Sequence, residues 1–416
     1  MDHTKHILFI SYDGMTDPLG QSQVIPYLAG LTRFGYRFTV LSCEKPKNYS
    51  EHQNEIRALL ESFCIKWVPV PYHKKPPVLS TIYDLYLLER KAVQLHKKEE
   101  FDLVHTRPGI PVLVALKLKK KFNLKFLNDI REFYADSRID GGIWNKQHFF
   151  YRKIYSYFKR KENEAVEKSD GIVCLTYAAE KIIRQWPAYK KQVPLQVIPC
   201  SVDIELFNPD HIDESKKTKL KSELNIKKDD CIISYLGSTG TWYLMEEMMQ
   251  FFKMISDQNP KAKFLFISAG SNQIIEKEAQ KSGLNKDKII VKGAPRNEVP
   301  VLLSLSSFSV FFIKPCYSKQ SSSPTKHGEI MAMGLPVISN EGVGDVAGII
   351  EKYQSGIVLK HLHQNEYGPA LELISDHSNF DKTRIRKGAI EFYNLDSAVG
   401  KYKNIYDLIL KNDADA

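Results

Sequence analysis

The sequence lacks several features that would place it in other classes of protein. It has no run of about 18 apolar residues, so we expect no membrane-spanning helix. The first residues lead directly into a strand-like stretch at 7–10, without the longer apolar segment and cleavage site of a signal peptide. The six cysteines form no close pair, which excludes a Cys-x-x-Cys metal site and favours buried free thiols in a reducing compartment. Repeats and low-complexity segments are also absent.

What remains is the composition of a globular protein. The 416 residues suit two domains of about 200 residues each, and a hydrophobic fraction of 43% is enough for packed cores. The net charge of +10 favours anionic partners such as nucleotide phosphates or phospholipid headgroups, although a solvated basic surface would carry the same charge. No nucleic-acid-binding motif accompanies the charge, so we expect no nucleic-acid partner.

Apolar stretches of strand length alternate with stretches of helical period, which predicts a doubly wound α/β fold. In the first half, strands are expected at 7–11, 37–42, 102–106, 125–129, 171–175 and 195–198, with helices at 21–34 and 110–121. After a lysine-rich stretch at 210–230 the pattern begins again. Strands are expected there at 232–236, 264–268, 289–292, 309–313 and from 336, with helices at 243–255, 325–333, 363–374 and 397–410.

Four segments carry residues suited to binding or catalysis. Residues 17–23 place a glycine, Gly20, between a strand and a helix, where backbone N–H groups can approach a ligand; a tight turn alone would also explain it. Residues 128–144 combine charges with aromatic side chains after a strand. Residues 197–209 contain Ile-Pro-Cys-Ser-Val-Asp and Phe-Asn-Pro. Residues 321–338 read Ser-Ser-Ser-Pro-Thr-Lys-His-Gly-Glu-Ile-Met-Ala-Met-Gly-Leu-Pro-Val-Ile.

The fourth segment has the clearest physical meaning. Ser322, Ser323 and Thr325 offer hydroxyl and N–H groups at a helix N-terminus, whose partial positive charge suits a diphosphate. Lys326 adds a full charge, and Glu329 lies one turn further on. An ordinary capped helix with its glutamate on the solvent face is the alternative.

In this order, the segments resemble those of family 4 retaining glycosyltransferases of the GT-B fold, over nearly the whole chain. The resemblance implies an α/β protein with two Rossmann-like doubly wound domains that face an interdomain cleft. Residues 1–203 would form the N-terminal acceptor-side domain and 204–395 the C-terminal donor-binding domain, with a helix at 396–416 crossing back to the first. It also implies transfer of a sugar from a nucleotide-diphosphate sugar to the hydroxyl of a glycan or lipid-linked acceptor, with retention, no metal and no other cofactor.

The resemblance assigns roles to individual residues. The catalytic candidates are His105, Asp129, Lys326 and Glu329. Of these, Asp129 stands where many family members carry a histidine. The acceptor side is assigned to Arg131, Asp136 and Arg138; a structural ion-pair network of Asp129, Arg131 and Asp136 is the alternative. The expected donor-binding residues are Gly20, Gly237, Ser238, Thr239, Ser322, Ser323, Thr325, Lys326, Glu329, Gly342 and Gly344.

Two departures bear on catalysis. Ser321 replaces the first of the two glutamates of the family's donor element, and no cation follows Gly237, where members carry an arginine and a lysine. Charge would then come from Lys326, from Arg296, or from Lys314 or Lys319. A non-catalytic nucleotide-sugar-binding subunit of a glycosylation complex is therefore the alternative to an enzyme.

Basic stretches at 117–121 and 151–161 lie in the first domain, and the second is interleaved with aromatic residues. One interpretation is a peripheral membrane contact, which would place a cytoplasmic protein at the inner face of the membrane, in the synthesis of a cell-surface polysaccharide or glycolipid. The other is a basic amphipathic helix whose aromatic face is buried.

Overall fold

The computed structural model describes residues 4–268, 270, 272–375 and 380–411, and the chain divides into two compact units. The N-terminal unit comprises Met1–Pro199 and Leu395–Ala416, and the C-terminal unit comprises Cys200–Asn394. These limits differ by at most four residues from the expected domain boundaries. Residues 412–416 of the expected last helix lie outside the described residues.

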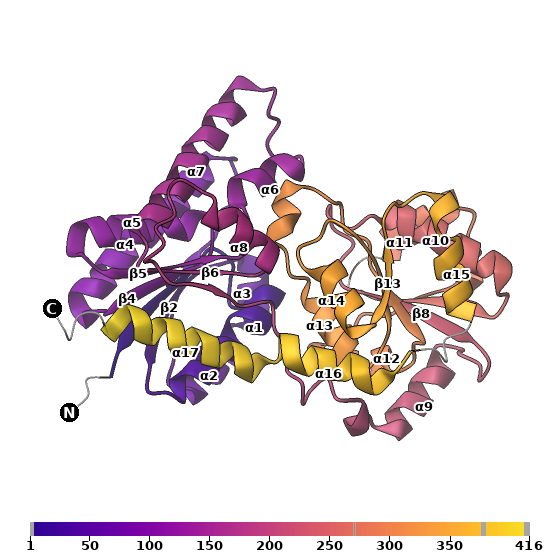
Figure 1. The fold of residues 1–416 in the computed structure, drawn as a ribbon. Helices are drawn as coiled ribbons and strands as arrows, with labels where there is room; N and C mark the ends of the chain where they lie inside the picture. Colours follow the sequence, from indigo (N-terminus) through magenta and orange to yellow (C-terminus); the bar gives the residue numbers. More distant parts are fainter. Residues whose placement is uncertain (1–3, 269, 271, 376–379, 412–416) are drawn as a thin grey trace. The chain divides into compact units, whose positions relative to one another are not determined.

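The N-terminal unit is built on a parallel sheet of strand order β3-β2-β1-β4-β5-β6-β7 (Figure 1). Successive side chains of β1 enter different cores, because a strand points them to opposite faces of the sheet. Ile7 and Phe9 pack with α2 and α17, whereas Leu8 and Ile10 pack with α4 and α5. The strands are β1 (His6–Ser11), β2 (Arg37–Glu44), β3 (Lys66–Pro71), β4 (Leu103–Thr106), β5 (Lys125–Ile130), β6 (Gly171–Cys174) and β7 (Leu195–Val197).

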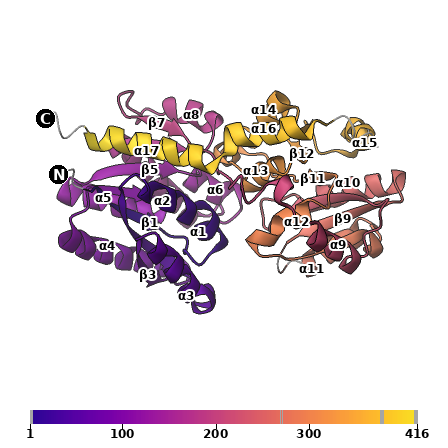
Figure 2. The same ribbon diagram turned by 90° about the horizontal axis from the view of Figure 1, so that it is seen from below.

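Helices cover both faces of this sheet. They are α1 (Pro18–Gln23), α2 (Ile25–Thr32), α3 (Pro46–Ser62), α4 (Leu79–Glu99), α5 (Ile110–Phe122), α6 (Tyr134–Asp140), α7 (Phe149–Lys168), α8 (Tyr177–Arg184) and α17 (Leu395–Lys411). The last of these returns to the N-terminal unit and lies along α2 (Figure 2). Gly30 permits this contact, since a Cβ there would lie 2.6 Å from a methyl group of Val399.

The C-terminal unit repeats the architecture, with a parallel sheet of order β10-β9-β8-β11-β12-β13. Its strands are β8 (Cys231–Leu236), β9 (Ala262–Ile267), β10 (Ile289–Val291), β11 (Phe308–Val310), β12 (Val337–Asn340) and β13 (Gly356–Leu359). Its α-helices are α9 (Glu214–Glu223), α10 (Met245–Gln258), α11 (Asn272–Lys281), α12 (Val299–Leu303), α13 (Thr325–Ala332), α14 (Val346–Tyr353), α15 (Gly368–Ser375) and α16 (Lys382–Tyr393). Short 3₁₀ turns include η3 (Arg296–Glu298) and η4 (Tyr317–Ser321).

Some elements differ from the expectation. In place of the single helix expected at 21–34, the chain forms two helices. The first, α1, begins at Pro18, and Val24 separates it from α2. Gly20 therefore lies inside a helix and not in a turn. Strands β3 and β13 were not expected, since β3 carries two prolines and β13 starts with a glycine. In the described part of the chain, no helix combines the length and apolar character needed to cross a membrane.

Candidate functional site

The candidate donor site lies where β8 ends and α13 begins. In an open parallel sheet, ligands bind beyond the carboxyl ends of the strands. Gly237 follows β8 with a φ of 120°, which favours glycine. A Cβ at this position would lie 2.7 Å from the Nζ of Lys326. The sequence offered four candidate cations for this loop, and the structure brings Lys326 from α13 to it.

Lys326 is enclosed by aromatic side chains. Its Nζ lies 4.3 Å from the ring centre of Tyr235 and 3.7 Å from that of Tyr243, and it donates a hydrogen bond of 3.3 Å to the Tyr235 hydroxyl. Such rings attract a cation through their negative faces. Burial nevertheless lowers the pKa of Lys326 to about 7. Near neutral pH the lysine is therefore only partly protonated, and it carries less than the full charge expected from the sequence.

Glu329 lies one turn along the same helix and is held by an ion pair. Its Oε1 accepts from an Nη of Arg296 at 2.6 Å, and the glutamate is only 6% exposed. Arg296 in turn lies over the ring of Phe207, 5.2 Å from its centre. The alternative of a glutamate on the solvent face is excluded, and its carboxylate has a fixed direction.

The serines before α13 have separate environments. Ser323 Oγ accepts a hydrogen bond from the backbone N–H of Cys200 at 3.2 Å, which ties the segment before the helix to the start of the C-terminal unit. Ser322 and Thr325 are half-buried at the helix N-terminus. Ser321 is fully buried and donates to the carbonyl of Ser318 at 2.8 Å. Its hydroxyl is thus engaged within η4.

A second glycine loop follows β12. Gly342 has a φ of 84° and packs against Pro315, and the Gly344 N–H donates to the carbonyl of Lys319 at 2.9 Å. The Lys319 ammonium lies 3.6 Å from the ring centre of Trp242, in the segment that follows Gly237. The loops after β8 and β12 and the turn η4 therefore pack together.

The remaining donor candidates are less enclosed. Ser238 is exposed, and its carbonyl accepts from the Tyr235 hydroxyl at 2.5 Å. Thr239 is half-buried. Gly20 lies in the other unit, where a Cβ would come within 2.3 Å of the carbonyl oxygen of Gly14. Close packing thus requires glycine at position 20, and its donor-binding role stays a prediction.

In the N-terminal unit, Asp129 is the centre of a buried polar network. Its Oδ2 accepts from the hydroxyl of Tyr402 at 2.7 Å and from Arg131 at 3.4 Å, and lies 3.3 Å from His105 Nε2. His105 Nδ1 lies 2.7 Å from the hydroxyl of Tyr406, so a neutral ring protonated at Nε2 satisfies both contacts. Burial alone would raise the pKa of Asp129, but Arg131 and His105 lower it to about 2.

This network differs from the alternative proposed from the sequence. Asp129 and Arg131 are indeed joined, but Asp136 belongs to another cluster, where it accepts from Tyr155 at 2.8 Å and from Lys159 at 2.9 Å. Arg138 pairs with Glu132 at 3.4 Å and lies over the ring of Tyr134. The catalytic and acceptor-side roles of these residues stay predictions.

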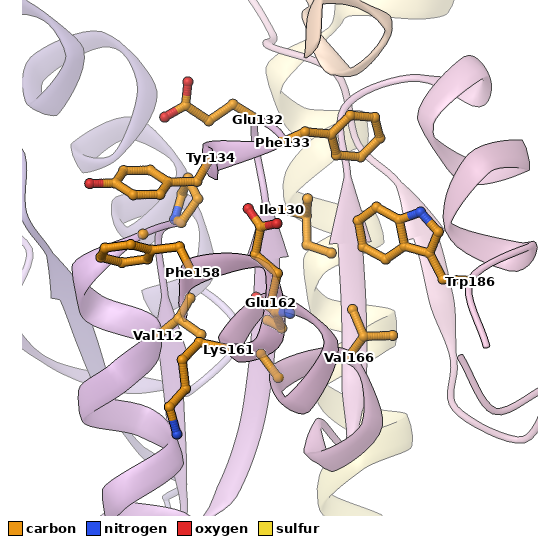
Figure 3. Close-up of a pocket in the computed structure, with 14 residues that line it drawn as sticks. Val112, Ile130, Glu132, Phe133, Tyr134, Phe158, Lys161, Glu162, Val166 and Trp186 are labelled. Atoms are coloured by element: carbon orange, nitrogen blue, oxygen red, sulfur yellow. The ribbon is translucent and has the colours of Figure 1, made fainter. Parts of the chain in front are cut away.

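An apolar pocket lies beside the second cluster, at the carboxyl ends of β4 and β5. Figure 3 shows Phe133 and Trp186 on one side and Phe158 on the other, with the carboxyl group of Glu162 between them. Burial raises the pKa of Glu162, although its Oε2 lies 3.0 Å from Lys159 Nζ. The pocket thus combines aromatic walls with two half-buried acidic residues, Glu132 and Glu162, and with Lys161.

Sequence reasoning missed several of these residues. Tyr235 and Tyr243 flank the loop after β8 and contact Lys326. The sequence signal that could have identified them is an aromatic residue on each side of a glycine at a strand end. Arg107 follows β4 and is buried, and its Nε has no hydrogen-bond partner in the described structure. It shares a small cavity with His105 and Asp129.

Among the described residues, no three His, Cys, Asp or Glu side chains lie close enough together to bind a metal ion.

Comparisons with known proteins account for both units. A family model described as Glycosyltransferase Family 4 matches residues 20–206, and one described as Glycosyl transferases group 1 matches residues 216–389. No curated protein sequence matches the chain.

Solved structures share the fold at low identity. A glycosyltransferase from Rickettsia africae ESF-5 has 16% identity and a TM-score of 0.75, covering 99% of this chain and 100% of that one. Sucrose-phosphate synthase from Thermosynechococcus elongatus has 16% identity and a TM-score of 0.75, covering 98% and 100%. HepE from Anabaena has 14% identity and a TM-score of 0.71, covering 97% and 99%. The chain has the two-domain GT-B fold and belongs to the group 1, family 4 type of glycosyltransferases.

Proposed function

We propose that this glycosyltransferase moves a sugar from a nucleotide-diphosphate sugar to an acceptor hydroxyl, with retention of configuration and without a metal ion. The observation that carries the proposal is the buried ammonium of Lys326 beside Gly237, in the first turn of α13. A helix N-terminus and a lysine together present N–H donors and positive charge to a diphosphate. HepE, which has a similar structure, was solved with UDP and with UDP-glucose.

Lys326 would act mainly on the leaving group. When the bond to the sugar breaks, negative charge grows on the departing diphosphate, and a preorganised cation lowers the energy of that state. In this proposal the lysine supplies the charge that a divalent metal supplies elsewhere. A leaving phosphate oxygen takes the acceptor's proton on the same face of the sugar, which retains the configuration. Glu329, fixed by Arg296, would accept hydrogen bonds from the ribose.

The acceptor in this proposal is a glycan or a lipid-linked glycan, in the synthesis of a cell-surface polysaccharide or glycolipid. The half-buried aromatic rings of Phe158 and Trp186, beside a small pocket, support it, because sugar rings and lipid chains both present apolar surface to such rings (Figure 3). Its position at strand ends of the N-terminal unit is where a ligand of an open α/β sheet binds.

A thermal-shift screen against UDP, GDP, ADP and their sugar conjugates, with magnesium or with EDTA, tests the donor site. A ligand that binds only the native state raises the melting temperature by mass action. We expect one nucleotide class to do so equally in EDTA, and Lys326→Met to abolish the shift. Lys261→Met, at an exposed lysine of the same unit, is the matched control. No shift with any nucleotide would contradict the donor site, and a shift that needs magnesium would contradict metal independence.

A transfer assay tests the reaction itself. The product formed from the donor class found in the screen is analysed by NMR for the configuration at the transferred anomeric carbon. The same configuration as in the donor supports retention, and the opposite one contradicts it.

A further inference from the structure

A basic and aromatic segment of the N-terminal unit is exposed to solvent. Residues 141–161 contain six lysines and arginines and no acidic residue. Residues 145–150 are all exposed, and the exposed fractions of Phe149 and Phe150 are 59% and 47%. We call residues 143–153 the aromatic arm. The expectation of a buried aromatic face does not hold for these two phenylalanines.

The arm extends beyond the sheet. Helix α7 has 20 residues and is therefore about 30 Å long, whereas the next strand, β6, has only four residues. The buried residues of α7 are Ala165 and Val166, near its C-terminal end. Figure 1 shows the other end of the helix rising from the N-terminal unit. Residues 149–154, at the start of α7, thus include no buried residue.

The charge of the arm is available to a partner. Further along α7, Lys159 and Lys161 form ion pairs with carboxylates. In the described part of the chain, Lys146, Arg152 and Lys153 form no ion pair. The Lys153 ammonium lies 4.4 Å from the ring centre of Phe149, so a cation accompanies the exposed aromatic ring.

Helix α4 presents a second apolar surface on the same side of the unit. Leu79, Ile82, Tyr83 and Tyr86 follow the spacing of one helical face, and each is more than half exposed. We call these four residues the α4 stripe. Helices α4 and α7 both pack against α5, and both begin at the carboxyl edge of the sheet, since each runs back between parallel strands. Lys74 and Lys75 precede the stripe.

We propose that the aromatic arm and the α4 stripe bind the surface of a bilayer that contains anionic phospholipid. Exposed apolar patches of this kind mark interaction sites. Aromatic side chains insert at the level of the headgroups, and lysine and arginine are attracted to the lipid phosphates. The absence of any acidic residue from the arm complements a uniformly anionic surface, whereas a protein surface would present charges of both signs.

Vesicle cosedimentation without donor or acceptor tests this inference. The full chain is mixed with vesicles of phosphatidylcholine alone, or with about 30% phosphatidylglycerol, at increasing salt. We expect binding to the anionic vesicles only, weakened by salt. The double variants Phe149→Ser/Phe150→Ser and Arg152→Gln/Lys153→Gln should each weaken it by about tenfold, and Ile82→Ser/Tyr86→Ser by less.

Matched controls separate this surface from general charge and from misfolding. Lys216→Gln/Lys219→Gln removes two cations from α9 of the other unit, and Ile390→Ser removes an exposed apolar residue from α16. Both should bind vesicles like the unchanged protein. All variants alter exposed side chains and should keep the melting temperature and the nucleotide-induced shift, so this test is independent of the donor site. No binding to anionic vesicles, equal binding to neutral ones, or unchanged binding by the arm variants would overturn the inference.

Discussion

The ammonium of Lys326 lies 3.7 Å from the ring centre of Tyr243, and no carboxylate lies within ion-pair distance of it in the described structure. The buried environment lowers the pKa of this lysine to about 7, against 10.5 for an ordinary lysine. An anionic diphosphate beside the ammonium would raise the pKa again. Near neutral pH, donor binding should therefore be accompanied by the uptake of a proton.

The affinity for a nucleoside diphosphate should fall as the pH rises above about 7. At most, the affinity falls about tenfold per pH unit, because one proton is taken up on binding. The dependence disappears below about pH 7, where Lys326 is already protonated before the nucleotide binds. Calorimetry in two buffers of different ionisation enthalpy measures both the affinity and the proton uptake. Lys326→Met should abolish the uptake and Lys261→Met should keep it. An affinity that stays constant from pH 7 to 9 would contradict the linkage.

The same pKa difference acts on folding with the opposite sign. The lysine binds its proton more weakly in the folded chain than in the unfolded chain, so between about pH 7 and 10.5 the unfolded state holds more protons. The free energy of unfolding contributed by this group therefore rises with pH in that window. Urea titrations of the empty protein at pH 7 and 9 should show a larger increase for the unchanged protein than for Lys326→Met.

Gly237→Ala should weaken nucleotide binding. The new Cβ would lie 2.7 Å from Lys326 Nζ, and a φ of 120° is unfavourable for alanine, at a cost of about 1–3 kcal/mol. Gly240→Ala is the matched control in the same loop, because a Cβ there meets only Ser238 Oγ at 3.8 Å. Calorimetric titration compares the two. Equal affinities for both variants would show that the contact between position 237 and Lys326 does not matter for binding.

Much of this site could be predicted from the sequence. The turn after β8 and the N-terminus of α13 were expected, because glycines at strand ends and hydroxyl residues before an apolar helix are local signals. The aromatic enclosure of Lys326 was not expected, since Tyr235 lies 91 residues before the lysine and only the packed sheet brings them together. The position of the lysine at the helix N-terminus could therefore be predicted from the sequence, whereas its lowered pKa could not.

The N-terminal unit gives the same lesson more strongly. His105 and Asp129 were predicted as polar residues at neighbouring strand ends, which the structure places 3.3 Å apart. Their other partners, Tyr402 and Tyr406, come from α17, about 300 residues further along the chain. The sequence pattern predicted a final helix, and the family resemblance implied that it returns to this unit. Which of its hydroxyl groups reach Asp129 and His105 depends on the rotation of the helix about its axis.

A ligand series should reveal the contact made by Glu329. If its carboxylate binds ribose hydroxyls, a 3′-deoxy nucleoside diphosphate should bind the unchanged protein about tenfold more weakly than the parent nucleotide. Glu329→Ala should bind both ligands alike, because the partner of the missing hydroxyl is gone. Arg296→Met should show an intermediate difference, since it leaves the carboxylate in place but without its ion pair. Equal discrimination by all three proteins would place the ribose elsewhere.

Tyr402→Phe should reduce stability without affecting the donor site. The hydroxyl donates a 2.7 Å hydrogen bond to the buried carboxylate of Asp129, and its loss leaves a charged acceptor less satisfied, at about 1.5–3 kcal/mol. Tyr157→Phe, at an exposed tyrosine of α7, should cost less than about 0.5 kcal/mol. Urea denaturation measures both.

The pH dependence of this effect follows from the carboxylate. The pKa of Asp129 is about 2 in the folded chain and 3.8 in a model peptide, so its stabilising contribution is complete above about pH 4 and is lost as the pH falls toward 2. The difference in unfolding free energy between Tyr402→Phe and the unchanged protein should therefore be constant from pH 5 to 8 and shrink at acid pH. A difference that instead begins to change as the pH falls below about 6.5 would assign the titration to His105, whose pKa burial lowers from that ordinary value. In that case the imidazole, and not the carboxylate, would control the network.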